Sequence, residues 1–228
     1  MYYLLTNILD YEITGPVFRQ IENMESISNS LNDDLVNCNQ ALLYTPDLSF
    51  TAAQKAKITD YLSCPSQYLI INEKLLKIFL EYKLESYQYF STKVNHRKKQ
   101  YNYYLFFIYG QNFDWVDYKN MKFIGKSNPP YSDFYREPHE KIGAQKKEIK
   151  VENPEHLINW QKLYPDYPNR EYENVILNYA NINSDMIRTP TLLGNHYLVS
   201  EALKNSIEQL GCTGMQFRTT DIFNRAIL

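Results

Sequence analysis

Glycine is scarce in this sequence, with only 7 glycines among 228 residues. The chain contains no GxSxG, GxxxxGKS/T or GxGxxG pattern, so the glycines of a nucleophile elbow, a phosphate-binding loop or a dinucleotide-binding turn are missing. Cysteine is also rare: Cys38, Cys64 and Cys212 are an odd number without CxxC spacing. They predict reduced thiols in a cytosolic protein and not a disulfide framework.

Long apolar runs are missing too, and no stretch approaches the roughly 20 apolar residues of a membrane span. The opening residues lack the basic region of a signal peptide. We therefore expect a cytoplasmic protein that does not bind a membrane. The formal charge of −2 argues against a general nucleic-acid-binding protein, because such proteins normally carry a positive field. We expect no nucleic-acid partner.

Patterns of catalytic and metal-binding residues are likewise missing. The histidines form no HExxH pattern, and none lies at zinc-ligand spacing from a cysteine. We expect no metal, no cofactor and no enzymatic activity. An enzyme with an unfamiliar site in the long segment 125–143, which contains His139, stays open as an alternative because long loops often carry function.

Tyrosine, in contrast, is abundant. The chain has 21 tyrosines and an aromatic content of 15%. A tyrosine suits half-buried positions, with its ring in an apolar layer and its hydroxyl at a polar edge, and it is common at binding surfaces. Two explanations remain open: a general compositional bias toward tyrosine, or an aromatic binding surface.

Alternating strand and helix signals predict an α+β fold, with a mixed or antiparallel sheet and amphipathic helices packed on it. The strongest strand signal, residues 101–109, is nearly continuously apolar and aromatic, which is typical of a central strand covered on both faces. No glycine- or serine-rich linker divides the chain. We expect one domain spanning residues 1–228, with a subdivision into 1–98 and 99–228 as an alternative. Further expected elements are strands at 2–6, 69–71, 87–90, 148–151 and 174–179, a strand pair at 113–118 and 121–124, and helices at 16–30, 51–56 and 154–160.

The segment 197–217 combines strand, helix and turn signals. Ser200 can cap a helix with apolar positions at Leu203 and Ile207, and Gly211 is a natural left-handed terminator. A similar order of apolar run, cap, amphipathic helix and alternating strand occurs at residues 70–89. Either two similar strand–helix–strand units are present, or common packing constraints produced both.

This closing segment resembles a family of bacterial polymorphic-toxin immunity proteins. The resemblance rests on a strand that ends Leu198-Val199-Ser200, a helix that begins Glu201-x-Leu203, and the exit Gly211-x-Thr213-Gly214-x-x-Phe217. Residues 68–89 and the Tyr-Tyr-Leu-Leu opening add weaker support, and residues 99–195 lie outside the resemblance. It implies a cytoplasmic protein that binds and neutralises a cognate secreted toxin, with no catalytic residues to carry over.

Two tyrosine-rich segments are the expected toxin-binding surfaces, because interfaces combine aromatic anchors with complementary charges. We expect the aromatic side chains to act as anchors and the carboxylates to meet a basic cleft. The first segment comprises Trp115, Asp117, Tyr118, Tyr131, Asp133, Tyr135, Arg136 and Glu137. The second comprises Tyr164, Asp166, Tyr167, Arg170 and Tyr172.

A nucleic-acid- or scaffold-binding module stays open as a further alternative. Its basis is two basic clusters, residues 97–99 and residues 146–147. A continuous basic face that joins them would favour this alternative over an inhibitor. Solvated charges beside turns explain both clusters equally well.

Overall fold

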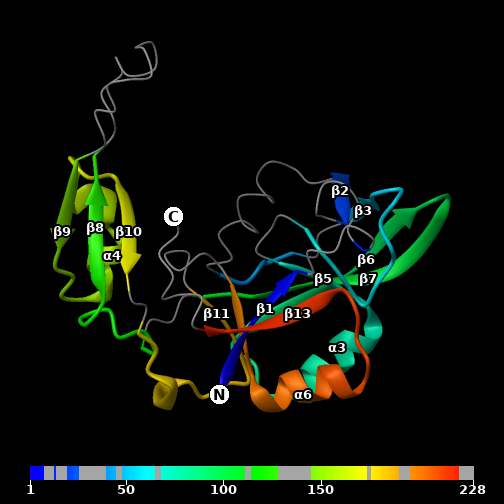
Figure 1. The fold of residues 1–228 in the computed structure, drawn as a ribbon. Helices are drawn as coiled ribbons and strands as arrows, with labels where there is room; N and C mark the ends of the chain where they lie inside the picture. Colours follow the sequence, from blue (N-terminus) through cyan, green and yellow to red (C-terminus); the bar gives the residue numbers. More distant parts are fainter. Residues whose placement is uncertain are drawn as a thin grey trace, which may run out of the picture. The chain divides into compact units, whose positions relative to one another are not determined.

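The computed structural model describes residues 1–7, 13, 20–25, 40–44, 48–64, 68–110, 114–127, 145–173, 176–189 and 196–220. These residues form an α+β fold (Figure 1). The chain divides into two compact units: residues 1–112 with 183–219, and residues 113–182 with 220–228. Residues 113–182 of the second unit are therefore inserted into the sequence of the first.

The first unit contains a six-stranded sheet in the order β2-β3-β6-β7-β5-β4. Its strands are β2 (Ile21–Glu25), β3 (Ser49–Ala52), β4 (Tyr61–Leu62), β5 (Leu69–Ile71), β6 (Tyr87–His96) and β7 (Lys99–Ile108). Strands β6 and β7 form an antiparallel hairpin that is paired from Tyr87 and Ile108 to His96 and Lys99. The alternative boundary between residues 98 and 99 falls in the turn of this hairpin, whereas the two units divide near residues 112 and 183.

The expected central strand at 101–109 is confirmed as β7. Its alternating side chains enter two separate hydrophobic clusters: Leu105 and Phe107 belong to one, and Phe106 and Ile108 to the other. Both faces of the strand are therefore buried along this stretch, which accounts for the continuous apolar run in the sequence.

A four-stranded sheet in the same unit has the order β11-β12-β1-β13. Its strands are β1 (Tyr2–Asn7), β11 (Met186–Arg188), β12 (Tyr197–Ser200) and β13 (Met215–Thr219). Strand β1 is antiparallel to both β12 and β13. The first strand of the chain thus lies between two strands from near its end.

Two amphipathic helices belong to the first unit, α3 (Glu73–Leu80) and α6 (Glu201–Gln209). They lie side by side in Figure 1. The hydroxyl of Tyr82, which follows α3, donates to Ser206 Oγ of α6 at 2.7 Å. Buried side chains of both helices share one hydrophobic cluster with Phe106 of β7 and Val199 of β12.

The second unit contains a three-stranded sheet in the order β10-β8-β9. Its elements are β8 (Lys122–Lys126), β9 (Lys146–Ile149), α4 (Pro154–Ile158), α5 (Trp160–Leu163), β10 (Asn169–Glu173) and the 3-10 helix η2 (Tyr179–Asn181). The ring of Trp160 packs on Phe123 of β8, with 6.4 Å between centroids. In the part of the chain that the structure describes, no helix is both long and apolar enough to cross a membrane.

Several sequence-based expectations are wrong. Within the helix expected at 16–30, residues 21–25 form strand β2, paired with β3. Residues 51–52 end β3 and a turn follows, so no helix forms at 51–56. Residues 114–118 do not form the expected strand, and their only β-type pairing among the described residues is an isolated bridge from Val116 to Leu177. The described part of the strand expected at 174–179 likewise has only this bridge, and η2 begins at Tyr179. A short apolar run fits the periodicity of a helix and that of a strand. Pairing with strands elsewhere in the chain determined which of the two formed.

Candidate functional site

The second expected surface is built around the turn that follows α5. The N–H of Tyr167 donates to the carbonyl of Tyr164 at 3.0 Å and closes the turn, with Pro165 at a position where its fixed φ is favourable. Trp160 holds this turn: its Nε1 donates to the carbonyl of Tyr167 at 2.7 Å. Its ring lies 4.8 Å from the ring of Tyr164 between centroids. A buried indole therefore fixes both ends of the turn.

Gly125 of β8 lets the turn lie close to the sheet. A Cβ at this position would lie 2.8 Å from Cβ of Tyr167 and 2.7 Å from Cδ1 of Ile149, and both distances are shorter than a normal carbon–carbon contact. The missing side chain thus makes room for the side chains of Tyr167 and Ile149. This glycine is a packing requirement of the surface and was not identified as such from the sequence.

The turn borders an open hollow of about 380 Å³. It is lined by residues 147–150, at the end of β9, and by residues 163–167. Both tyrosines of the turn are half-buried, and Leu163 is 47% exposed. Lys147 Nζ lies 5.8 Å from the centroid of the Tyr167 ring, within the range of a cation–π contact. The hollow therefore combines aromatic rings with charges of both signs.

The structure brings together Tyr164, Asp166 and Tyr167 of the second expected surface. Asp166 is exposed. Arg170 and Tyr172 lie in β10, where their backbones pair with Gly125 and Phe123 of β8. The second segment is thus one contiguous part of the second unit.

The first expected surface needs correction. Trp115 is buried, with 1% of its surface exposed, so its indole is not an exposed anchor. The Asp117 carboxylate accepts a hydrogen bond from Nδ2 of Asn120 at 2.8 Å, within a local turn, and Tyr118 is half-buried. The remaining members lie outside the described residues: Tyr131, Asp133, Tyr135, Arg136 and Glu137. The alternative catalytic loop with His139 also falls largely outside them.

Groups with catalytic or metal-binding chemistry are dispersed. The Cys64 thiol donates to the carbonyl of Tyr68 at 3.4 Å, and burial is the largest cause of the raised pKa of Cys212. Burial also lowers the pKa of His196, which favours the neutral imidazole. Among the described residues, no group of three or more His, Cys, Asp or Glu side chains is placed to hold a metal ion.

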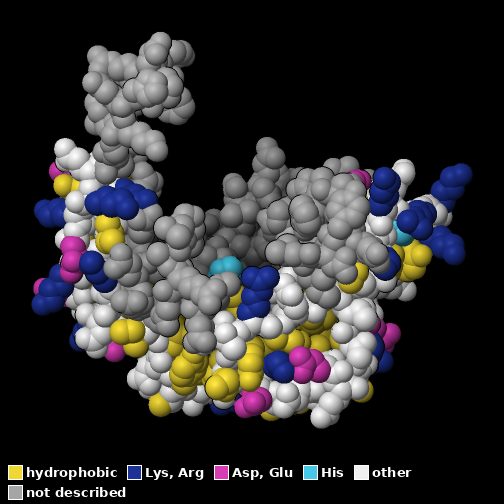
Figure 2. Space-filling model, in the orientation of Figure 1, with side chains coloured by type: hydrophobic (Ala, Val, Ile, Leu, Met, Phe, Trp, Pro, Cys, Tyr) yellow, Lys and Arg dark blue, Asp and Glu magenta, His cyan; other side chains and the backbone are white. Residues whose placement is uncertain are grey.

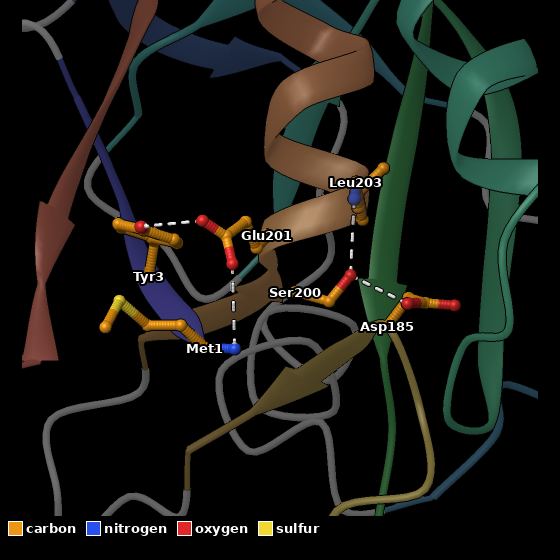
Figure 3. A network of polar contacts seen from close by, with 6 residues as sticks. All are labelled: Met1, Tyr3, Asp185, Ser200, Glu201 and Leu203. Atoms are coloured by element: carbon orange, nitrogen blue, oxygen red, sulfur yellow. Dashed lines mark hydrogen bonds and ion pairs between the residues drawn. The ribbon is translucent and has the colours of Figure 1, made fainter.

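The first half of the segment 197–217 caps and anchors α6. Figure 3 shows Ser200 Oγ accepting the hydrogen bond of the Leu203 N–H at 3.2 Å and donating to Asp185 Oδ1 at 2.7 Å. Glu201 lies beside β1: its carboxylate accepts from the Tyr3 hydroxyl at 3.5 Å and lies 4.0 Å from the Met1 amine. The cap is therefore part of a network that joins α6 to strands distant in sequence.

The second half of this segment joins the α6–β13 turn to the six-stranded sheet. The N–H and hydroxyl of Thr213 both donate to Asp60 Oδ2, at 2.7 and 2.8 Å, while Asn72 Nδ2 donates to Oδ1 at 2.7 Å. Partial burial alone would raise the pKa of Asp60, but these hydrogen bonds and nearby Lys74 outweigh it, so the pKa is lowered. These contacts give the turn between α6 and β13 a structural role: it is attached to the six-stranded sheet through Asp60.

No known protein-family model matches the chain, and no curated protein matches it in sequence.

Proposed function

We propose that this protein is an immunity protein, which binds a cognate bacterial toxin and neutralises it by direct contact. The contact surface includes the hollow beside the turn Tyr164–Tyr167. The observation that carries this proposal is the turn itself, which Trp160 holds by a hydrogen bond and a ring contact. Tyrosines on a fixed backbone lose little conformational entropy when a partner binds them.

The charges around the turn suit a protein partner. Lys147 and Lys150 line the hollow together with Glu148 and Asp166, so positive and negative groups alternate over a small area. Such an arrangement favours one orientation of a complementary partner and disfavours others. An inhibitor of this kind requires no catalytic group, only a rigid surface that covers the active site of the toxin.

Co-expression with the product of the neighbouring gene tests this proposal. We expect the full-length chain to restore growth and to co-purify with that product. The double variant Tyr164→Ala/Tyr167→Ala should weaken the complex by about 30-fold or more, because loss of an interface anchor costs about 2 kcal/mol. The matched control is Tyr179→Ala, an exposed tyrosine of the same unit outside the hollow.

Circular dichroism and the thermal unfolding midpoint establish that each variant is folded. A folded double variant that binds as tightly as the control would remove the hollow from the interface. A neighbouring product that is harmless and does not bind would remove the immunity proposal itself.

We also propose that the scaffold consists of two similar strand–helix–strand units, β5-α3-β6 and β12-α6-β13, with the helices packed on the sheets. In each, a strand outside the unit, β7 or β1, lies between the first and last strands and is antiparallel to both. Each helix is capped by a polar side chain, Asn72 or Ser200, that accepts from the N–H three residues later. The same topology and the same cap support a common plan.

A further inference from the structure

The β6–β7 hairpin carries charge of one sign only. Between Tyr87 and Ile108 the sequence contains four cationic residues and no aspartate or glutamate. All four are exposed: Lys93, Arg97, Lys98 and Lys99. Figure 2 shows Lys and Arg side chains gathered at the end of this hairpin. In a chain with a formal charge of −2, this end is a local concentration of positive charge.

The turn of the hairpin adopts a backbone conformation that suits other residues better. Arg97 has φ 47° and Lys98 has φ 64°, so both central residues of the two-residue turn are left-handed. Asparagine followed by glycine is the preferred pair in such turns, because a Cβ is disfavoured in this region. The chain nevertheless has two long cations there. Strain kept at a surface position points to a function for the side chains that cause it.

Contacts with the neighbouring segment hold the turn in place. Nε of Arg97 donates to the carbonyl of Gln54 at 2.6 Å, and Nε2 of His96 lies 3.3 Å from the same oxygen. Strand β3 pairs with β6 up to Asn95. Lys98 and Lys99 form no ion pair with any acidic side chain in the described part of the chain. The turn is thus held in place, and Lys98 and Lys99 are presented on it without a neutralising ion pair to any described residue.

Further from the turn, one face of the hairpin carries aromatic groups, with the paired residues Lys93 and Asn102 between them and the turn. Tyr89 is 42% exposed and lies 6.0 Å from Tyr104 between ring centroids. On the same face, Lys93 Nζ donates to Asn102 Oδ1. A hollow of about 430 Å³ separates this face from the start of α3 and is lined by residues 72–74, 91–93 and 102–104.

We infer that the β6–β7 tip and its adjoining face dock an acidic, Asp- and Glu-rich segment of the protein partner. The inference rests on the proposed function for the identity of that partner, the toxin. The cations occupy the end of a single hairpin, whereas a nucleic-acid-binding groove carries basic groups along the path of the phosphate backbone. Charge complementarity therefore favours a compact acidic protein segment.

The test measures fluorescence anisotropy of two probes of similar charge, a peptide of about ten glutamates and an oligothymidylate of about ten nucleotides, at low salt. The full-length chain is compared with Arg97→Asn/Lys98→Gly. We expect this variant to bind the peptide about fivefold more weakly or worse, because each exposed charge contact contributes modestly. The control Lys83→Gln/Arg218→Gln removes two exposed charges elsewhere in the same unit and should bind the peptide as the natural chain does.

The same variant should unfold at an equal or higher temperature, since the preferred residues in the turn offset the loss of the hydrogen bond from Arg97 to Gln54. If the variant binds the peptide more weakly but is at least as stable as the natural chain, Arg97 and Lys98 serve binding and not folding. Equal peptide binding by the two variants, or tighter binding of oligothymidylate than of the peptide by the natural chain, would overturn the inference. Neither probe involves the toxin, so failure here is distinct from failure to rescue growth.

Discussion

Two glycines in the turn between α6 and β13 have the same backbone requirement but different surroundings. Gly211 has φ 63° with no atom within 4 Å of an added Cβ, whereas a Cβ on Gly214, at φ 96°, would lie 2.1 Å from the carbonyl oxygen of Tyr61. Gly211→Ala should therefore lower the free energy of unfolding by about 1–2 kcal/mol. Gly214→Ala should lower it by about 3–5 kcal/mol, because a rigid backbone atom must move.

Urea denaturation of the two variants checks this difference. Gly211→Asn is a useful control, because asparagine tolerates the left-handed conformation better than alanine does. If both alanine variants lost the same stability, the close approach of Gly214 to Tyr61 would not be present in solution.

The sequence correctly predicted the roles of single residues where those roles depend on nearby residues in the chain. The caps at Asn72 and Ser200 and the terminator at Gly211 are confirmed, since each signal lies within a few residues of the helix end. The contact of Thr213 with Asp60 spans 153 residues, and no local pattern carries it. The same holds for the burial of Trp115, which looked like an anchor because its neighbours are polar.

The N-cap of α6 should contribute measurably to the stability of the protein. Ser200→Ala removes the hydrogen bond to the Leu203 N–H and leaves Asp185 without its hydroxyl donor. The free energy of unfolding should fall by about 1–2 kcal/mol, as for other lost N-caps. Ser200→Asn retains a capping oxygen and should cost less. Chemical denaturation monitored by circular dichroism checks the order, and equal losses for the two variants would contradict the capping role.

Element types were predictable where a pattern was long or was reinforced by a cap, as for α3, α6 and β7. The helix predictions at residues 16–30 and 51–56 were wrong, because a few apolar residues fit a helix or a strand equally well. Pairing between β2 and β3 stabilises the strand form of both segments. The candidate surface shows the same division. Its aromatic and charged residues were identified from the sequence, but the hydrogen bond from Trp160 and the room made by Gly125 required the tertiary structure.

The insertion of residues 113–182 predicts that the first unit can fold without them. Within the first unit, Nη2 of Arg188 donates to the carbonyl of Gly110 at 3.1 Å, so the chain leaves for the insertion and returns from it at neighbouring positions. Residues 113–182 should be replaceable by a short linker of about four residues. We expect the shortened chain to keep cooperative unfolding and the exchange-protected amides of β6 and β7, because its hydrophobic clusters stay complete.

Hydrogen exchange and thermal unfolding of the shortened chain measure this outcome. A control with the same linker in place of residues 83–86, which connect α3 to β6, should fail to fold because it disrupts the first unit. A shortened chain without a cooperative transition would show that the first unit depends on the insertion.

The position of β1 between β12 and β13 also has a consequence for synthesis on the ribosome. Tyr3 pairs with Val199 and with Thr219, so β1 is synthesised long before its two partner strands and must wait for them. At about 5–20 residues per second, that wait lasts about 10–40 s. Meanwhile Leu4 and Leu5, both buried in the finished fold, have no place in a sheet. The nascent chain should therefore engage a chaperone at its first strand, and release should follow emergence of β13.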